Sequence, residues 1–320
     1  MRFLSFPLIV LAVAVVSACT HAADPKTELG ARPLSEPLVP FINPSDTVAD
    51  YLACLRDDDV MIVSAHRGGP TPGYAENGLA TIANTLSQAP FLVEVDIRMT
   101  ADGVFVLLHD EDLSRTTTGE GLIAETTSAD LAALQLVDND GLPTGHPIPT
   151  LAEALDWARG RAFLQLDVKS GAPIDAVAAQ VVERDAAPFA AVIAYTVEYA
   201  LRAASVDEDL TVSVEILDTE TLDLLETGGL SAERLMAWTG IETERPNLWA
   251  SLNDRGVSAA WGSLWYLDRQ VIENGQTEEF ARLAEVGLDV LSSDIHLEAF
   301  QAVEKRQDTA AAVARCNAAL

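Results

Sequence analysis

Short apolar runs of strand length recur along the chain, and most are continuous rather than alternating. They occupy residues 60–65, 91–97, 104–108, 162–168, 191–195, 210–214, 235–238, 257–261 and 288–291. Segments with helical spacing separate many of them, at 76–87, 150–158, 174–185 and 277–284. Continuous apolar strands are typical of a parallel sheet covered on both faces. The repeated strand–helix units therefore predict an α/β fold, a TIM (β/α)8 barrel. A doubly wound sheet is the alternative, but no GxGxxG follows the first run.

The chain divides into regions of different pattern. Residues 1–18 join one arginine to a long apolar run, which predicts a signal peptide for export. Residues 19–44 contain five prolines and predict a tether. Residues 45–320 hold the barrel pattern. Within them, residues 109–150 are rich in Thr, Gly and Asp and predict a small insertion after the third strand.

The end of the signal segment, Val-Ser-Ala-Cys, resembles a bacterial lipobox. The resemblance implies cleavage before Cys19 and lipidation of its thiol, which would anchor a periplasmic protein to a membrane. Cleavage near Ala22 or Ala23 without a lipid is the alternative. In an oxidising compartment Cys54 and Cys316 could form a disulfide or stay as separate thiols.

The net charge of the chain limits the kinds of molecule that it can bind. The chain has 49 acidic against 20 basic residues, a net charge of −29. Such a surface repels phosphate backbones, so nucleic-acid binding is excluded as a function. A small anionic substrate stays compatible with this charge only if local cations or a metal ion reverse the field at its site.

Polar residues stand at the ends of several predicted strands, where apolar residues would pack better. The carboxyl ends of the strands build the active site of a TIM barrel. Residues two apart on a strand share a face, so Glu94 and Asp96 project together, as do Asp167 and Lys169. Four strand ends carry such residues: His66 and Arg67, Glu94 and Asp96, His109 and Asp110, and Asp167 and Lys169.

These residue types suit phosphoryl chemistry with a metal ion. The carboxylates of Glu94, Asp96 and Asp167 would supply oxygen ligands for Ca²⁺ or Mg²⁺. Arg67 and Lys169 would hold a phosphate.

Two histidines complete the predicted set. His66 and His109 could serve as base and acid near neutral pH. Each motif alone is commonly structural, as a strand-end histidine, a surface acid pair or a salt bridge. Their occurrence on successive predicted strands at one end favours phosphodiester cleavage.

The residues also resemble the glycerophosphodiester phosphodiesterase family. Five segments match its motifs in order: AHRGG (65–69), AENGLATI (75–82), EVDIRMTADGVFVLLHDEDLSRTTTGEG (94–121), LQLDVKSG (164–171) and VGLDVLSSDIHLEAF (286–300). The resemblance implies a TIM barrel with a small insertion and a divalent metal ion as cofactor. It also implies hydrolysis of small-molecule glycerophosphodiesters to sn-glycerol 3-phosphate and an alcohol.

The resemblance also implies roles for single residues. The acid and base would be His66 and His109, the phosphate ligands Arg67 and Lys169, and the metal ligands Glu94, Asp96 and Asp167. Four neighbours have subsidiary assignments: Glu76 lies near the metal or glycerol or favours a helix N-terminus by its charge, Asn77 caps that helix, and Asp110 and Arg115 order the insertion.

The chain departs from the family pattern at three places. AENG replaces the usual PENT, which is a mild change. Asp167 stands where the family usually has glutamate, so its carboxylate reaches one methylene less far. The usual WTVN motif of the seventh strand is missing. Trp238, Trp261 and Trp265 are candidates for the leaving-group pocket. Core packing is the alternative for each of them and is favoured for Trp238.

Two other functions stay open at this point. One is a phospholipase D-like or lysophospholipase D-like hydrolase of the same barrel type. The other is a non-catalytic lipoprotein that binds phosphodiesters, although such a protein would be expected to lose a histidine or an acid that this chain keeps.

Overall fold

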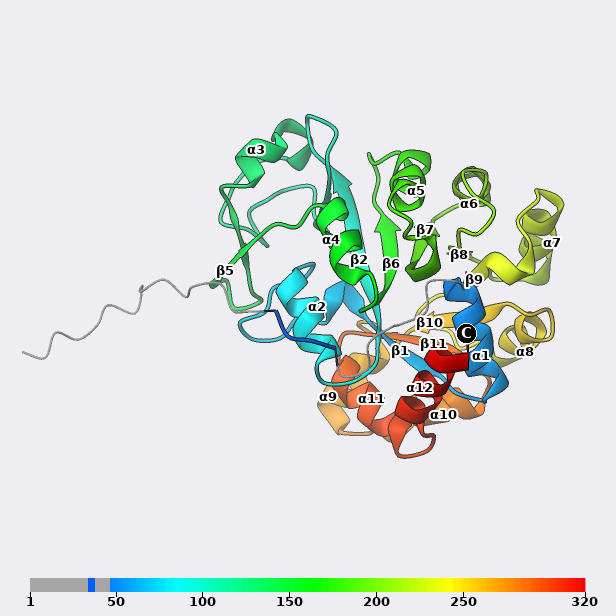
Figure 1. Ribbon diagram of the computed structural model, residues 1–320. Helices are drawn as coiled ribbons and strands as arrows, with labels where there is room; N and C mark the ends of the chain where they lie inside the picture. The colour runs from blue at the N-terminus through cyan, green and yellow to red at the C-terminus, as the bar shows by residue number, and fades with distance from the viewer. Residues whose placement is uncertain (1–33, 38–46, 320) are drawn as a thin grey trace, which may run out of the picture.

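A closed eight-stranded parallel barrel forms the centre of the protein in a computed structural model that describes residues 34–37 and 47–319. Each strand pairs with the next, and the last pairs with the first, which confirms the predicted TIM barrel (Figure 1). In barrel order the strands are β1 (Ile62–Ala65), β2 (Leu92–Met99), β6 (Phe163–Val168), β7 (Ala190–Ala194), β8 (Val212–Glu215), β9 (Leu235–Trp238), β10 (Ser258–Gly262) and β11 (Val290–Ser293).

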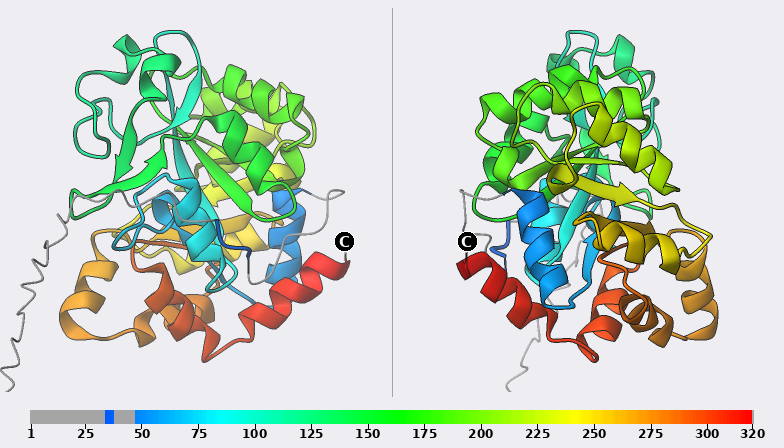
Figure 2. Two further views of the ribbon diagram at one scale, coloured as in Figure 1. Left: turned by 60° about the vertical axis from the view of Figure 1, so that its left-hand side comes forward. Right: turned by 90° about the vertical axis from the view of Figure 1, so that its right-hand side faces the viewer.

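Helices cover the outside of the barrel (Figure 2). Their apolar faces pack against strands that are buried on both sides, as the continuous apolar runs predicted. Thr47 and Thr150 begin two of them with capping boxes, in which the threonine side chain and an acid three residues later bond each other's backbone amides. The helices are α1 (Val48–Asp57), α2 (Leu79–Leu86), α4 (Leu151–Ala158), α5 (Ile174–Glu183), α6 (Val197–Ala204), α7 (Thr219–Thr227), α8 (Pro246–Asn253), α9 (Leu267–Asn274), α10 (Glu278–Glu285), α11 (His296–Glu304) and α12 (Thr309–Ala319).

The predicted third barrel strand, residues 104–108, was wrong as a barrel element. It forms β3 (Phe105–Leu107), which runs antiparallel to the end of β2 and belongs to the insertion. The insertion therefore follows the second barrel strand. It also holds α3 (Ser128–Leu131), a two-stranded sheet of β4 (Gln135–Val137) and β5 (Pro143–Pro147), and a small core of its own. It lies beside the barrel (Figure 1).

Alternate residues of the strands fill the barrel in layers. Ser64 donates a hydrogen bond to Gln165, whose amide in turn lies 3.3 Å from the sulfur of Met236. This polar layer forms a floor, and the next inward residues on the strands stand above it, because side chains on one strand alternate between faces. The strand ends above the floor therefore face a shared space.

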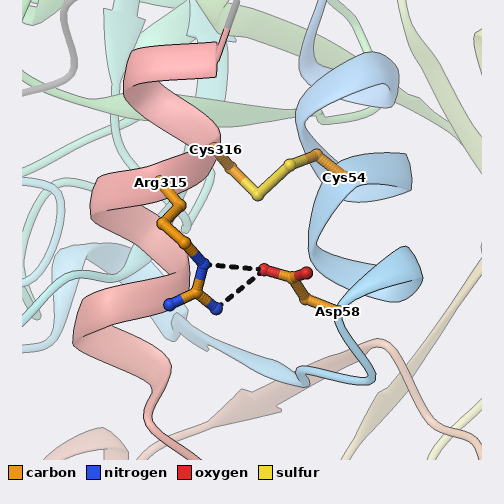
Figure 3. The surroundings of a disulfide bond; sticks show 4 residues. All are labelled: Cys54, Asp58, Arg315 and Cys316. Carbon is orange, nitrogen blue, oxygen red and sulfur yellow. Dashed lines mark hydrogen bonds and ion pairs between the residues drawn. A yellow bond between two sulfur atoms is a disulfide. The ribbon is translucent and has the colours of Figure 1, made fainter.

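A disulfide joins the two ends of the barrel domain. Cys54 of α1 and Cys316 of α12 are bonded, with their Cα atoms 5.8 Å apart, and Arg315 pairs with Asp58 beside them at 2.8 Å (Figure 3). Of the two alternatives left open by the sequence, the structure has the disulfide. The predicted signal peptide, Cys19 and nearly all of the tether lie outside the described residues. Among the helices that are described, none is long and apolar enough to cross a membrane.

Candidate functional site

A cavity of about 330 Å³ opens at the carboxyl ends of the barrel strands. Asp96 lies directly beside it, completely buried. The structure therefore brings the predicted catalytic, phosphate-binding and metal-binding residues together at one rim. Six of them line the cavity: His66, Arg67, Glu94, His109, Asp167 and Lys169.

The loop after β1 is shaped by unusual backbone conformations. Arg67 has a φ of 51°, in the left-handed region, and its amide donates a 2.7 Å hydrogen bond to Glu94 Oε2. Gly69 has a φ of 77°, and a Cβ there would lie 2.6 Å from Cε1 of His296. Only glycine avoids both the strain and this clash. The two glycines of the HRGG motif thus hold the histidine and arginine against the acids of β2.

Three carboxylates form a compact acidic triad, Glu94, Asp96 and Asp167. One oxygen from each lies within 4.8 Å of the others, and Asp96 and Asp167 are direct neighbours in the β2–β6 register. Glu94 Oε1 and Asp167 Oδ1 are buried and accept no hydrogen bond from the described residues. Burial, and then the charge of Asp96, raise the pKa of Glu94 to about 8. Oxygen ligands of this kind and spacing fit a hard divalent cation, so the shorter Asp167 does not break up the set.

Lys169 lies against two members of the acidic triad. Its Nζ is 2.8 Å from Asp96 Oδ1 and 2.5 Å from Asp167 Oδ2. Burial would lower the pKa of Lys169, but the charges of the two carboxylates raise it well above the ordinary lysine value. Burial would likewise raise the pKa of Asp96, and Lys169 lowers it overall. Lys169 therefore stays charged at the cavity wall.

Two histidines each bond an aspartate through Nδ1. His66 Nδ1 lies 2.7 Å from Asp294 Oδ1, and His109 Nδ1 lies 2.6 Å from Asp110 Oδ1. Burial would lower the pKa of His66, but the hydrogen bond to Asp294 and the charge of Glu94 raise it overall. A carboxylate on Nδ1 holds the proton there and leaves Nε2 of each ring for proton exchange.

Each aspartate is itself held in place. The amide of Asp294 donates a 2.6 Å bond to Asp268 on α9. Asp110 accepts hydrogen bonds from Arg115, which lower the pKa of Asp110 well below the ordinary range. Each aspartate of the two His–Asp pairs is therefore held by a second contact as well as by its histidine.

Glu76 is buried and joins the arginines of the site. Its carboxylate accepts bidentate hydrogen bonds from Arg115 at 2.8 and 2.9 Å and a further hydrogen bond from Arg67 at 3.2 Å. The prediction that Asn77 caps α2 was wrong, since the cap is Gly78. Asn77 instead donates to Asp96 Oδ2 at 2.7 Å and accepts from its amide, so it orders the acidic triad.

The tryptophans divide differently from the prediction. Trp261 is buried in the core, with its indole bonded to the Thr243 carbonyl. Trp238, for which core packing was favoured, lines the cavity with Trp265. Trp265 is 57% exposed and has a φ of 59°, and its ring stands edge-on to His66 with the centroids 6.2 Å apart.

The motif assignments missed two residues of the site. Asp294 directly follows β11, so the strand-end rule that found the other acids also applies to it. Tyr195 ends the apolar run of β7, and its hydroxyl donates a 2.8 Å bond to Asp167. Burial, and then the charge of Asp167, raise the pKa of this hydroxyl above its ordinary value.

Comparison with known families supports the resemblance that the sequence motifs indicate. Residues 66–194 match the Glycerophosphoryl diester phosphodiesterase family. This match covers the loop after β1, the acidic triad, both histidines and Lys169. It confirms the family resemblance for this part of the chain.

Three relatives illustrate the extent of the similarity. The chain is 36% identical over 131 residues to glycerophosphodiester phosphodiesterase 1 of Mus musculus, which is 40% of this chain and 39% of that protein. A crystal structure of a glycerophosphoryl diester phosphodiesterase from Parabacteroides distasonis has a TM-score of 0.77 and 29% identity, over 83% of this chain and 94% of that one. An Oleispira antarctica phosphodiesterase was solved in complex with the product sn-glycerol-3-phosphate. Its structure has a TM-score of 0.59 and 22% identity, over 78% of this chain and 98% of that one. The chain thus spans less than half of the curated mouse relative.

Proposed function

We propose that this protein hydrolyses glycerophosphodiesters to sn-glycerol 3-phosphate and an alcohol. The observation that carries the proposal is the pair of braced histidines, His66 and His109, at one cavity with an acidic triad and two cations. The family match and the P. distasonis likeness support the reaction class. sn-Glycerol 3-phosphate is the product held by the O. antarctica phosphodiesterase, whose likeness to this chain is one of fold.

The side chains of the cavity would have separate roles in binding the phosphate and in transferring protons. Arg67 and Lys169 carry the positive charge that an anionic phosphodiester needs in a protein of net charge −29. Nε2 of one histidine removes a proton from the attacking hydroxyl, and Nε2 of the other protonates the departing alkoxide. The aspartates on Nδ1 keep both rings in the required tautomer and orientation.

The acidic triad would hold a divalent cation, Ca²⁺ or Mg²⁺. The unpaired, buried oxygens of Glu94 and Asp167 support this, because Lys169 contacts only Asp96 and the other oxygen of Asp167, which leaves three close carboxylates with one lysine between them. When bound, the ion would add positive charge beside the phosphodiester and make the phosphorus easier to attack. Asn77 and Tyr195 hold two of the ligands in position.

Substitution of the histidines tests the proposal. His66→Ala and His109→Ala should each lower kcat by about 10²- to 10⁴-fold, the usual contribution of a general acid or base. His146→Ala, in the insertion and away from the cavity, serves as the matched control. Near wild-type hydrolysis by either cavity variant would refute the catalytic assignment, and full activity in excess chelator would refute the metal assignment.

Exposed aromatic residues near the mouth favour a second candidate, hydrolysis of lysophospholipids. Trp265, Tyr266 and Tyr199 are 57%, 46% and 44% exposed. An acyl chain could pack on such side chains, whereas a glycerophosphodiester has none. Comparing turnover of glycerophosphocholine and lysophosphatidylcholine separates the two: a faster reaction with the lipid would replace the first proposal.

The same proposal includes export and anchoring through a lipidated Cys19. The N-terminal sequence pattern supports it, and so does the Cys54–Cys316 disulfide, since such bonds persist in oxidising compartments. Cell fractionation of the full chain and of Cys19→Ala tests it. The wild type should remain with the membranes and the variant should not; equal distribution of both would refute the anchor.

A further inference from the structure

We infer that the cavity selects diesters whose head group carries a positively charged ammonium, and that Glu215, Trp238 and Trp265 form its subsite. This inference rests on the proposed function and deepens it. It concerns the half of the cavity that the acid–base and metal assignments leave unused.

The barrel order separates the cavity into two halves. Glu94 and Asp96 stand on β2, and Trp238 ends β9, four strands away around an eight-stranded ring. In the same way β8, which ends in Glu215, lies opposite β1. A diester whose phosphate is held by Arg67 and Lys169 can therefore extend its other arm across the cavity towards β8, β9 and β10.

The far half offers the surroundings that an ammonium group needs. Among the described residues, the carboxylate of Glu215 forms no hydrogen bond or ion pair, and it is the only carboxylate lining the cavity outside the acidic triad. Glu215 and Trp238 are direct neighbours in the β8–β9 register. An indole face beside a carboxylate attracts a cation through both the ring quadrupole and the charge.

The rest of this half is poorly suited to other head groups. Arg67 and Lys169, the arginine and the lysine that line the cavity, follow β1 and β6, so an anionic head group in the far half would meet only the charge of Glu215. Apart from Glu215 and Ser213 on β8, the far wall is lined by apolar and tryptophan side chains, so a polyol would find few hydrogen-bond partners there. The apolar side chains of this wall are Ile193, Met236, Ile241 and Leu264.

The backbone at Trp265 points to a ligand as well. A non-glycine residue in the left-handed region costs about 1 to 3 kcal/mol, and such strain concentrates at functional sites. The φ of Trp265 is 59°, yet 57% of the residue is exposed, so its own burial offsets little of that cost. The strained turn holds the indole beside His66, where it would contact the departing alcohol.

The net charge favours the same class of substrate. A chain with a charge of −29 repels a diester that carries an additional negative group. A diester with an ammonium head group has no net charge and is not repelled. The field of the protein and the local carboxylate thus act in the same direction.

Release of glycerol 3-phosphate, the product common to all glycerophosphodiesters, provides the test. With the full chain and Ca²⁺ or Mg²⁺ added, kcat/KM is measured for glycerophosphocholine and for glycerophosphoglycerol, whose head group is neutral. We expect the first to exceed the second by about tenfold or more, the size of one favourable cation contact. The preference should shrink as salt is added, because exposed charges are screened.

Two matched variants locate the effect. Glu215→Gln should lower kcat/KM for glycerophosphocholine by about tenfold and change that for glycerophosphoglycerol less than about twofold. Glu183→Gln removes the same charge from the end of α5, at the opposite end of the barrel, and should change neither. Equal losses on both substrates, or no loss, would overturn the inference.

The outcomes also separate the inference from the proposed function. If the wild type releases glycerol 3-phosphate from both substrates without preference, the subsite is refuted and the hydrolase stands. If it releases none from either, the proposed function fails and the subsite fails with it.

Discussion

Removal of the Cys54–Cys316 disulfide should lower the free energy of unfolding by several kilocalories per mole. The bond closes a loop of 262 residues, and the chain-entropy relation gives roughly 5 to 6 kcal/mol at 25 °C for a loop of that length. The Arg315–Asp58 ion pair beside the disulfide is exposed and would offset about 1 kcal/mol of this loss or less. The total free energy of unfolding of a folded protein is typically roughly 5 to 15 kcal/mol, so the loss would be a large part of it.

Equilibrium urea unfolding measures this loss. The wild type is unfolded with and without a thiol reductant, and the double variant Cys54→Ala with Cys316→Ala is unfolded under the same two conditions. Reduction should move the wild-type midpoint to lower urea and leave the double variant unchanged. The single variant Cys54→Ala should resemble the double variant. A wild-type midpoint that does not move, once thiol titration proves full reduction, would refute the entropy argument.

Three further predictions follow from individual contacts. Asp294→Asn should lower kcat with little change in KM, because it loosens the bond that orients His66 without touching the substrate; steady-state kinetics measures both. Gly69→Ala should lower stability and activity together, since its Cβ would meet His296 at 2.6 Å in a backbone conformation that alanine disfavours. Asp289 has a pKa raised by burial from 3.8 to about 7, so it binds a proton more tightly in the folded than in the unfolded protein. Its contribution to stability is complete below about pH 4 and is lost as the pH rises through 7, by up to about 4 kcal/mol; Asp289→Asn should flatten the pH dependence of the unfolding free energy.

Each of these three has an outcome that contradicts it. An Asp294→Asn variant with wild-type kcat would show that His66 needs no such partner, while Asp294→Glu tests whether a carboxylate alone suffices. A fully stable Gly69→Ala variant would mean that the loop and His296 shift apart at little cost. For Asp289, an unfolding free energy with the same pH dependence in wild type and variant would assign the titration to other groups.

The sequence predicts the barrel well because its strands are buried on both faces. Continuous apolar runs then mark every barrel strand, and the errors at their ends are small. The same signal misassigned residues 104–108, because an apolar run carries no information on strand direction. β3 is as buried as its neighbours, but only the antiparallel pairing with β2 places it in the insertion.

The site was predictable where spacing along one strand fixes the geometry. Glu94 and Asp96 share a face by the two-residue period, and register then sets Asp167 beside Asp96. Asn77 and Trp238 were misassigned because local rules favour a cap and a core residue, and tertiary contacts override both. Residues of the far wall, such as Glu215, belong to no motif, and only barrel closure brings them opposite the strand ends that carry Arg67 and Lys169.

Barrel closure is also the step that completes the His66–Asp294 pair. His66 follows β1 and Asp294 follows β11, the two strands that join the ends of the sheet, and the residues are 228 positions apart. The disulfide joins α1, which precedes β1 and packs against β10, to α12, which follows α11. A partly opened seam would separate the histidine from its aspartate while the acidic triad on β2 and β6 stays intact. The covalent link between the chain ends therefore stabilises the fold on which the contact between His66 and Asp294 depends.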